Sequence, residues 1–383
     1  MKDREQFSKI AAVSFCLILG IVFALNLMAN DRSFSSKEKR VLQKAPALAM
    51  SHYLDGRMEK EFETYANDQF FARDGAVKVK VAADVTMGAL KSLDVIKAKD
   101  SYLMQDIKKP DHARMKETIA SLPEFRQRYP SIKMYFMLAP NAANILHDKL
   151  PKTVKVNDQN LYMDSFFKRS AGSGYINIDV RKALIRESKK KQIYYRTDHH
   201  WTTAGAFTAY GEFLKAAGKD NPIGYDPLTV KNDFTGSLSA RSGFTGGKFD
   251  SVQIYEPKAG SDYKPSIIYF ADSKKKTTGF YQLKNLKNGY SYDTFGGYNR
   301  PLYTVETPTI SSDKLLLIKD SYANEMIPFL SQNYRKIVVV DPRYYYGDID
   351  DLIASEDINQ VLFIFNANTF FEEITLKSAL SGK

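Results

Sequence analysis

The stretch KLLLIKDSYANEMIPFLSQN, residues 314–333, decides the fold. An apolar run ends at Lys319, Asp320 and Ser321 follow, and a helical pattern begins near Ala323. A continuous apolar run bounded by turn residues is typical of a strand buried on both faces of a sheet. The stretch therefore predicts a strand, a turn that contains Ser321, and a helix.

Similar apolar runs recur along the chain, and helical patterns separate several of them. The further predicted strands are residues 132–138, 174–180, 336–341 and 360–366. One intervening helical pattern, TAGAFTAYGEFLKAAG at 203–218, ends at Gly218, a residue that favours helix termination. Alternation of strand and helix predicts an α/β protein with a parallel sheet of the doubly wound type and helices on both faces.

Two other regions depart from this rhythm. Residues 219–312 are rich in Gly, Tyr, Lys and Ser, and they predict a largely β insertion that forms a wall of the active site. Residues 31–50 suit a tether, and residues 51–383 are expected to form one domain. This domain should open with a helix, because the uncharged residues Met58, Phe62, Tyr65 and Gln69 recur at three- and four-residue spacing while charged residues fill the other side.

The N-terminal run 10–28 holds no charged residue. Its length is close to the ~20 residues that cross a bilayer as a helix. The run is longer than the apolar core of a signal peptide and lacks a small-residue cleavage pattern, so an uncleaved anchor is favoured over a signal peptide. Lys2, Arg4 and Lys9 precede it, which predicts a single-pass protein of the cell membrane with residues 1–30 as cytoplasmic tip and anchor, and an extracytoplasmic domain.

Composition narrows the partners of that domain. The chain has 383 residues, a formal charge of +11 and one cysteine, Cys16, which lies in the anchor. The exported part can therefore form no internal disulfide and depends on packing for its stability. Its basic residues are dispersed, and outside the membrane they do not indicate a nucleic acid partner; they suit solvated faces or a weak attraction to anionic envelope polymers.

A second polar stretch, YYRTDHHWTTAG at 194–205, suggests nucleophilic catalysis. This chemistry needs a hydroxyl, a base within hydrogen-bond reach and a third group that orients the base. Asp198 can accept from one imidazole nitrogen of His200 while the other nitrogen faces Ser321 at a strand end. Two alternatives stay open: a zinc site, although few other ligands exist, and a polar turn beside an N-cap serine.

These stretches resemble the DHHW proteins, relatives of the alginate and secondary cell-wall polysaccharide O-acetyltransferases. The resemblance implies a permuted SGNH-hydrolase-like (flavodoxin-like) fold, with the catalytic Asp, His and Ser at Asp198, His200 and Ser321. One departure is the sequence KDS at 319–321, where SGNH esterases have glycine-aspartate-serine. The pieces that carry the resemblance lie in this order at 34–46, 65–74, 197–202, 234–243, 295–299 and 319–324.

Other residues are candidates for binding roles. The Ser321 backbone N–H is the first candidate for an oxyanion donor, with Asn324, or the pair Gly296 and Gly297 together with Asn299, as further candidates; a simple Gly-Gly turn is the alternative. Trp201 and Tyr195 are candidate substrate contacts. For Trp201, packing in the core is the competing interpretation.

The resemblance implies an extracytoplasmic serine-dependent O-acetyltransferase that acts on a cell-envelope polysaccharide or exopolysaccharide. The acetyl group would come from a membrane-bound O-acyltransferase partner, and neither cofactor nor metal is expected. A carbohydrate acetylesterase that uses the same three residues is the first alternative, because transfer and hydrolysis differ only in how well water is excluded. A non-catalytic polysaccharide-binding scaffold is the second.

Overall fold

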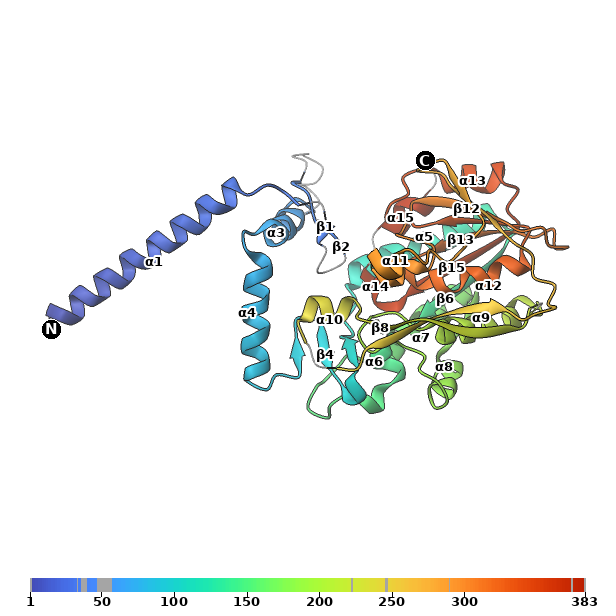
Figure 1. Cartoon of the computed structure of the whole chain (residues 1–383). Helices are drawn as coiled ribbons and strands as arrows, with labels where there is room; N and C mark the ends of the chain where they lie inside the picture. Colours follow the sequence, from blue (N-terminus) through green and yellow to red (C-terminus); the bar gives the residue numbers. More distant parts are fainter. Residues whose placement is uncertain are drawn as a thin grey trace. The chain divides into compact units, whose positions relative to one another are not determined.

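The computed structural model describes residues 2–32, 34–35, 40–46, 57–221, 223–244, 247–288, 290–372 and 375–381 (Figure 1). The chain forms two compact units. The first comprises Met1–Ala89 and Ala240–Phe244, and the second comprises Leu90–Ser239 and Thr245–Lys383. The start expected for the domain, residue 51, lies outside the described residues. Residues 57–89 fall in the first unit, although they were expected to belong to the domain 51–383. The limits of that domain stay a prediction.

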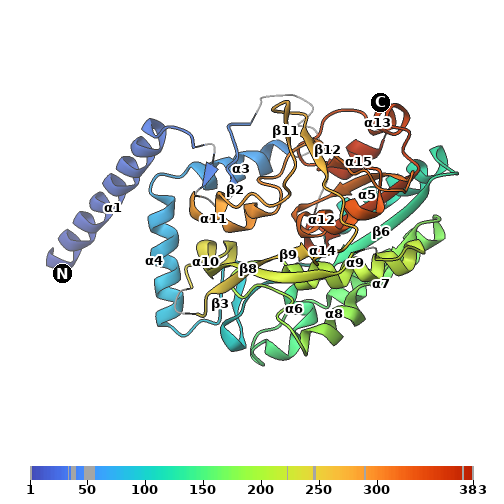
Figure 2. The same ribbon diagram turned by 45° about the vertical axis from the view of Figure 1, so that its right-hand side comes forward.

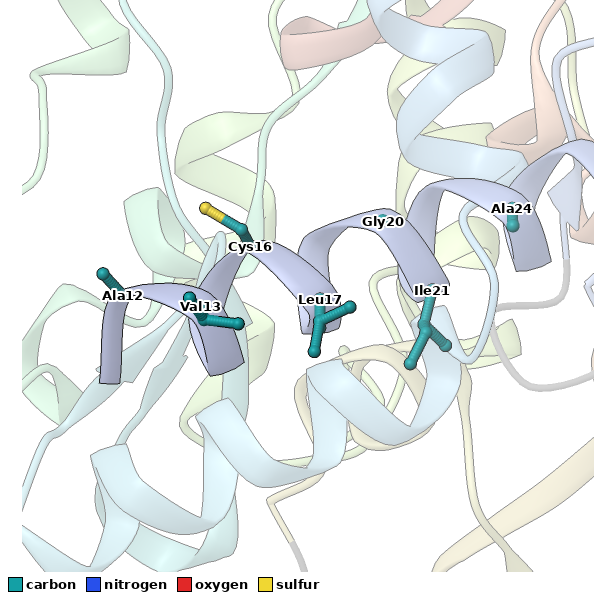
Figure 3. A pocket seen from close by; sticks show the side chains of 7 residues that line it. All are labelled: Ala12, Val13, Cys16, Leu17, Gly20, Ile21 and Ala24. Atoms are coloured by element: carbon teal, nitrogen blue, oxygen red, sulfur yellow. The ribbon is translucent and has the colours of Figure 1, made fainter. Parts of the chain in front are cut away.

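The first unit begins with a long helix, α1 (Lys2–Met28). Its segment Gln6–Met28 is the one helical segment in the described part of the chain that is long and apolar enough to cross a membrane. Figure 3 shows seven of its small or apolar side chains, from Ala12 to Ala24, which line a shallow hollow along the helix. This composition fits either a membrane anchor or a signal sequence.

In the rest of the first unit, the last two residues of helix α3 (Arg57–Gln69) bind the segment that follows α1. The Gln69 side chain accepts a hydrogen bond from the Arg32 N–H at 2.9 Å and donates to the Arg32 carbonyl at 3.0 Å. Asp68 accepts from the Gln43 N–H at 2.9 Å. The predicted helix is confirmed from residue 57 onward, and the described residues of the expected tether bind its end. The elements are β1 (Phe34–Ser35), β2 (Arg40–Val41), α3 (Arg57–Gln69) and α4 (Arg73–Thr86).

The second unit is built on an eight-stranded sheet with the strand order β11-β10-β12-β14-β13-β15-β6-β7. The five strands from β14 to β7 are mutually parallel and match the five segments predicted from apolar runs. The strands are β6 (Lys133–Ala139), β7 (Ile176–Ile178), β10 (Ile267–Phe270), β11 (Lys275–Thr277), β12 (Leu302–Glu306), β13 (Lys314–Lys319), β14 (Lys336–Val340) and β15 (Gln360–Asn366).

The sheet is mixed, whereas a wholly parallel sheet was expected. The three strands β10, β11 and β12 come from the insertion and pair antiparallel; β12 joins β14 with Leu302 opposite Val340. The insertion also forms a long hairpin of β8 (Tyr225–Phe234) and β9 (Asp250–Pro257). Figure 2 shows this hairpin beside α9, where the Thr203 hydroxyl donates to the Gln253 carbonyl at 2.6 Å.

Helices cover both faces of the sheet, as expected from the strands. Along β13, Leu315 and Leu317 enter one apolar core while Leu316 and Ile318 enter the other. The first core receives α6 (Ala142–Ile145), α8 (Arg181–Ser188), α9 (Thr203–Ala217) and α12 (Ile327–Leu330). The second receives α5 (His112–Arg128), α7 (Gln159–Gly172), α13 (Ile349–Ser355), α14 (Ala367–Glu372) and α15 (Thr375–Leu380).

Smaller elements complete the fold. Helix α9 ends as predicted at Gly218, which adopts a left-handed conformation with φ of 64°. A three-stranded sheet comprises β3 (Lys91–Ser92), β4 (Val95–Lys97) and β5 (Leu103–Gln105). The remaining short helices are α10 (Ser237–Ser242) and α11 (Asn285–Asn288), with 3-10 turns at Lys99–Ser101, His147–Lys149, Ser291–Thr294, Ser321–Glu325 and Ser331–Asn333.

Candidate active site

The Asp-His-His-Trp sequence forms a tight loop that leads into α9. A bridge between Tyr194 and Trp201 closes the loop, and the Thr202 side chain caps α9 by accepting from the Gly205 N–H. Gly205 allows close packing, because a Cβ atom there would lie 2.4 Å from the Ile193 carbonyl oxygen. The loop is thereby fixed at both ends.

Within this loop, Asp198 and His200 form a hydrogen-bonded series with Ser321. Asp198 Oδ1 lies 2.6 Å from His200 Nδ1, and His200 Nε2 lies 2.8 Å from Ser321 Oγ. Asp198 Oδ1 also accepts from the His200 backbone N–H at 3.0 Å. Asp198 and His200 are buried, whereas Ser321 is only partly buried. The structure therefore brings together the three residues that the sequence analysis selected, with the hydroxyl on the open side.

The carboxylate of Asp198 is held by several donors. Its Oδ2 accepts from the Ser237 N–H at 2.8 Å and from the Tyr290 hydroxyl. Burial alone raises the pKa of Asp198, but the imidazoles of His200 and His199 and the hydrogen bonds to the carboxylate outweigh burial and hold the pKa well below its usual range. An ionised Asp198 fixes His200 with Nδ1 protonated, so that Nε2 can accept the serine proton.

Two tyrosines of the insertion complete this arrangement, and the sequence analysis did not identify either. Besides Tyr290, the Tyr292 ring stacks on the His200 imidazole, with centroids 3.7 Å apart and an angle of 7° between the planes. The Tyr292 hydroxyl donates to the Ser321 carbonyl at 2.9 Å. The expected contribution of the insertion to the site wall is thus made by Tyr290 and Tyr292.

Ser321 lies in a turn at the carboxyl end of β13. Asp320 fixes this turn: it accepts from the Tyr322 N–H at 2.9 Å and from the Asn366 N–H at 2.8 Å. The helix expected near Ala323 is instead a 3-10 turn, Ser321–Glu325, followed by the short α12. The Ser321 N–H makes no hydrogen bond to another described residue, so it remains available as an oxyanion donor.

A buried lysine organises the side chains beyond the serine. Lys319 Nζ donates to Asn324 Oδ1 at 2.8 Å and to Asn299 Oδ1 at 3.1 Å, and it lies 3.8 Å from Asp341. Burial lowers the pKa of Lys319 to about 8, although Asp341 opposes this shift. Asn324 Nδ2 also donates to Asn299 Oδ1, at 3.4 Å, so the Asn299 oxygen is the acceptor in both contacts and its amide nitrogen makes no hydrogen bond to another described residue.

The glycine pair does not fit the expected donor role. The Gly296 N–H already donates to the Phe280 carbonyl at 3.0 Å, and the Gly297 N–H donates to the Asp293 carbonyl at 2.9 Å. Their positive φ angles, 84° and 85°, belong to a turn. Gly297 is therefore removed from the oxyanion candidates, whereas Ser321, Asn299 and Asn324 stay.

The two candidate substrate contacts are buried. Trp201 has no exposed surface, and its indole N–H donates to the Tyr322 carbonyl at 2.9 Å. Tyr195 is 1% exposed, and its hydroxyl donates to Glu325 at 3.0 Å. A substrate at the surface reaches neither ring, so the prediction of substrate contacts is corrected for both residues. The competing interpretation of Trp201, packing in the core, is confirmed.

The metal alternative depends on Asp198, His199 and His200, whose ligand atoms lie within 4.8 Å of one another. Both ring nitrogens of His200 already face hydrogen-bond partners, and His199 Nδ1 lies 2.7 Å from the Ser237 hydroxyl. Structural zinc prefers four ligands. Among the other histidines, His147 lies on a separate 3-10 turn and His52 lies outside the described residues. This donor set fits a hydrogen-bonded series better than a metal centre.

The fold and site define a mixed α/β protein with Asp, His and Ser in hydrogen-bond series at the end of a parallel strand. Residues 116–340, more than half of the chain, match the DHHW protein family. The chain belongs to this family, as its sequence stretches indicated. No curated protein sequence matches the chain.

Several solved structures share the fold. A DHHW family protein from Eubacterium siraeum has 22% identity and a TM-score of 0.61, over 75% of this chain and 97% of that one. Bacillus cereus PatB1 has 18% identity and a TM-score of 0.61, over 74% and 99%; it is also known with a sulfonyl adduct. The O-acetyltransferase domain of Pseudomonas putida AlgJ is more distant, with 15% identity and a TM-score of 0.49 over 74% and 99%.

Proposed function

We propose that this protein is a serine-dependent O-acetyltransferase that acts outside the cytoplasmic membrane on a polysaccharide hydroxyl. The observation that carries the proposal is the 2.8 Å contact between His200 Nε2 and Ser321 Oγ, with Asp198 behind the imidazole. A serine so placed has the base and the orienting carboxylate that nucleophilic acyl transfer requires. Acetyl as the acyl group comes from the family resemblance.

In the first half-reaction, Ser321 would take the acetyl group. His200 Nε2 removes the hydroxyl proton as Oγ attacks the acetyl carbonyl of the donor. The negative charge that develops on the carbonyl oxygen is met by the Ser321 N–H and the Asn299 amide. The intermediate then collapses: the bond to the donor breaks, the leaving group takes the proton from His200, and an acetyl ester of Ser321 remains.

The second half-reaction would reverse these roles with a sugar. His200 removes a proton from an acceptor hydroxyl, whose oxygen attacks the ester carbonyl. When the second intermediate collapses, Ser321 Oγ leaves and regains its proton from His200. Throughout, the ionised Asp198 stabilises the imidazolium, and the stacked Tyr292 holds the ring in place.

The donor side of the proposal concerns a partner. A domain outside the membrane has no access to cytoplasmic thioesters, so the acetyl group has to be delivered across the bilayer. The family resemblance points to a membrane-bound O-acyltransferase, and α1 would keep the two proteins in one membrane with the N-terminus in the cytoplasm.

The proposal is tested with the full-length protein in detergent, p-nitrophenyl acetate as donor and an envelope oligosaccharide as acceptor. Mass spectrometry follows the acetylated protein, free acetate and acetylated sugar. We expect an acetyl group on Ser321, and acetylated sugar that disappears in Ser321→Ala. A sulfonyl fluoride should modify the same serine. A protein that is neither acetylated nor sulfonylated at Ser321 would favour the binding scaffold.

Hydrolysis is the second candidate because the Ser321 side of the site is only partly buried, so that water can approach an acetyl ester there. An acetylesterase would use the same three residues with water as the acceptor. Free acetate that is formed at the same rate with and without every sugar would favour the esterase.

A further inference from the structure

One segment of the insertion, residues 290–300, surrounds the candidate triad. At its start, Tyr290 binds Asp198 and Tyr292 stacks on His200. At its end, Asn299 lies 3.1 Å from Lys319 Nζ and 3.4 Å from Asn324, which belongs to the turn that Ser321 begins. Tyr298, which directly precedes Asn299, therefore lies at the border of the site.

Three exposed tyrosines lie in the two loops at this edge of the sheet. In the described part of the chain, the exposed tyrosines are Tyr298 at 58%, Tyr344 at 39% and Tyr346 at 87%. Tyr298 precedes β12 and the other two follow β14. These two strands pair antiparallel, with Leu302 opposite Val340, and the Asp341 N–H donates to the Pro301 carbonyl at 3.2 Å. The two loops therefore leave the sheet side by side, at the edge where Ser321 follows β13.

The Tyr298 ring is held in place although it is exposed. The Arg300 guanidinium lies 4.1 Å from its centroid and 4.3 Å from that of Phe270, and the Tyr298 hydroxyl donates to Asp272 at 3.4 Å. A Cβ atom at Gly296 or Gly297 would meet nothing within 4 Å, so the surface beside the ring is open. A fixed ring with one face covered and space beside it loses little entropy on binding.

The two arginines of this surface are each paired with a carboxylate. Arg300 Nη1 lies 2.5 Å from the Asp272 carboxylate, and Arg343 makes two hydrogen bonds to Asp341 at 2.8 Å and 2.6 Å. Because both arginines beside the rings are neutralised by a carboxylate, the contact that the exposed rings offer is an apolar one, which suits the C–H face of a neutral pyranose. Exposed aromatic residues that cluster beside a site indicate ligand binding rather than chance exposure.

We propose that Tyr298, Tyr344 and Tyr346 form a binding surface for neutral pyranose rings, which holds the acceptor polysaccharide next to Ser321. The role of the bound sugar as acetyl acceptor rests on the proposed function. Binding of sugar to the surface does not depend on acylation of Ser321. Tyr298 directly precedes Asn299, which contacts the turn that Ser321 begins, so it would carry the sugar whose hydroxyl is acetylated. The other two tyrosines would extend the surface along the polysaccharide.

The test measures binding alone, by calorimetry with the full-length protein in detergent. The probes are cellotetraose and chitotetraose, with tetragalacturonate as the anionic comparison. We expect at least one neutral tetrasaccharide to bind more tightly than tetragalacturonate, and Tyr298→Ala to raise its Kd about tenfold, the usual loss at a central aromatic contact. Tyr298→Phe, which keeps the ring, should bind like the unaltered protein. Phe249→Ala removes an aromatic ring that is 63% exposed elsewhere, and it should change nothing.

Three results would overturn the inference: neither neutral probe binds, Tyr298→Ala binds as well as the unaltered protein, or Phe249→Ala weakens binding as much as Tyr298→Ala does. Tighter binding of tetragalacturonate would refute its charge argument. The absence of an acetyl group on Ser321 would contradict the proposed function instead. That result would not change the binding measurements. In transfer assays, Tyr298→Ala should lower the ratio of acetylated sugar to free acetate.

Discussion

Asp198 decides which nitrogen of His200 carries the proton of the neutral imidazole. Its Oδ1 lies 2.6 Å from Nδ1, and the depressed pKa keeps the carboxylate ionised at neutral pH. The proton of the neutral imidazole therefore stays on Nδ1, and Nε2 is free to accept from Ser321. His199 offers no such arrangement, because its Nδ1 faces Ser237 and its side chain is partly exposed.

The first prediction compares these two histidines. Ser321→Ala and His200→Ala should each lower kcat for p-nitrophenyl acetate by roughly 10³-fold or more, and Asp198→Asn by about 10²- to 10⁴-fold through loss of the correct tautomer. His199→Ala, the matched control, should keep at least a tenth of the activity. Steady-state kinetics with circular dichroism as a folding check would decide; an inactive, folded His199→Ala beside an active His200→Ala would refute the assignment.

The second prediction concerns Glu325, which is buried beneath the site. Its Oε1 accepts from Tyr195 at 3.0 Å and Thr203 at 3.2 Å, while its Oε2 has no hydrogen-bond partner among the described residues. Burial raises the pKa of Glu325 well above its usual range, although the hydrogen bonds from Tyr195 and Thr203 lower it. The folded protein thus binds a proton that the unfolded chain releases above pH ~4.3, so stability falls as the pH rises from there toward the folded-state pKa.

Glu325→Gln imitates the protonated carboxyl and does not titrate. Its Tm should be close to that of the unaltered protein at pH 4 to 5, and the difference should grow in favour of Glu325→Gln as the pH rises to 8. Thermal unfolding followed at several pH values measures this difference. A difference in Tm that does not change with pH, or that favours Glu325 at pH 8, would contradict the prediction.

At the level of elements, the turn before α10 supports the acid of the triad. The Ser237 N–H binds Asp198 Oδ2, and the Gly236 N–H binds the Thr197 hydroxyl at 2.9 Å. A Cβ atom on Gly236 would lie 2.3 Å from the Asp198 Cβ and 2.6 Å from its Oδ2. No real side chain tolerates such distances, so the glycine is required for Asp198 to reach His200.

The third prediction is that Gly236→Ala displaces Asp198 and lowers activity by at least about tenfold, with a loss of roughly 1–3 kcal/mol in the free energy of unfolding from overpacking. Gly211→Ala is the control: this glycine lies inside α9, and a Cβ atom there meets nothing within 4 Å. It should leave activity unchanged and stabilise by up to about 1 kcal/mol. Denaturant unfolding and ester hydrolysis measure both effects, and equal behaviour of the two variants would show the argument to be wrong.

The elements that carry the triad could be predicted because their sequences have strong local signals. The apolar run of β13 and the capping pattern of α9 are visible in the sequence, and the structure brings the polar residues at both ends within hydrogen-bond distance. Tyr290 and Tyr292 could not be found in this way, since no periodic pattern leads to them and only tertiary packing brings them to His200. The error at Gly297 has a similar cause, because a sequence does not tell whether a backbone N–H is already bonded.

At the level of the whole molecule, the contrast between local sequence signals and tertiary packing explains which strands of the sheet could be predicted. Four of its five parallel strands, β6, β13, β14 and β15, are buried on both faces and have continuous apolar sequences, whereas the edge strand β7 is only partly buried. The antiparallel strands β10, β11 and β12 lie toward one edge, and β11 has no buried residue. Apolar and polar residues therefore alternate only weakly in these segments. The sequence indicated β structure there, but it did not show that these strands join the main sheet.

The last prediction concerns α1 and the membrane. The segment Gln6–Met28 has the length and hydropathy of a span, and its apolar side chains are exposed in the described structure, which in water would be unfavourable. Three basic residues precede the apolar run, and they favour insertion with the N-terminus inside. We therefore expect the protein to resist carbonate extraction from membranes and its second unit to be digested by protease added to intact cells.

Leu17→Lys with Ile21→Lys should release much of the protein from the membrane fraction, because each lysine near the helix centre costs about 2.5–3.5 kcal/mol on insertion. Leu161→Lys with Phe249→Lys is the matched control: both side chains are exposed on the second unit, at 66% and 63%, and their replacement should leave the protein membrane-bound. N-terminal sequencing of the mature protein separates the two interpretations of α1. A chain that begins at Met1 is anchored as predicted, whereas a soluble chain that begins after Met28 would make α1 a cleaved signal and leave the acetyl-transfer partner without a membrane tether to this protein.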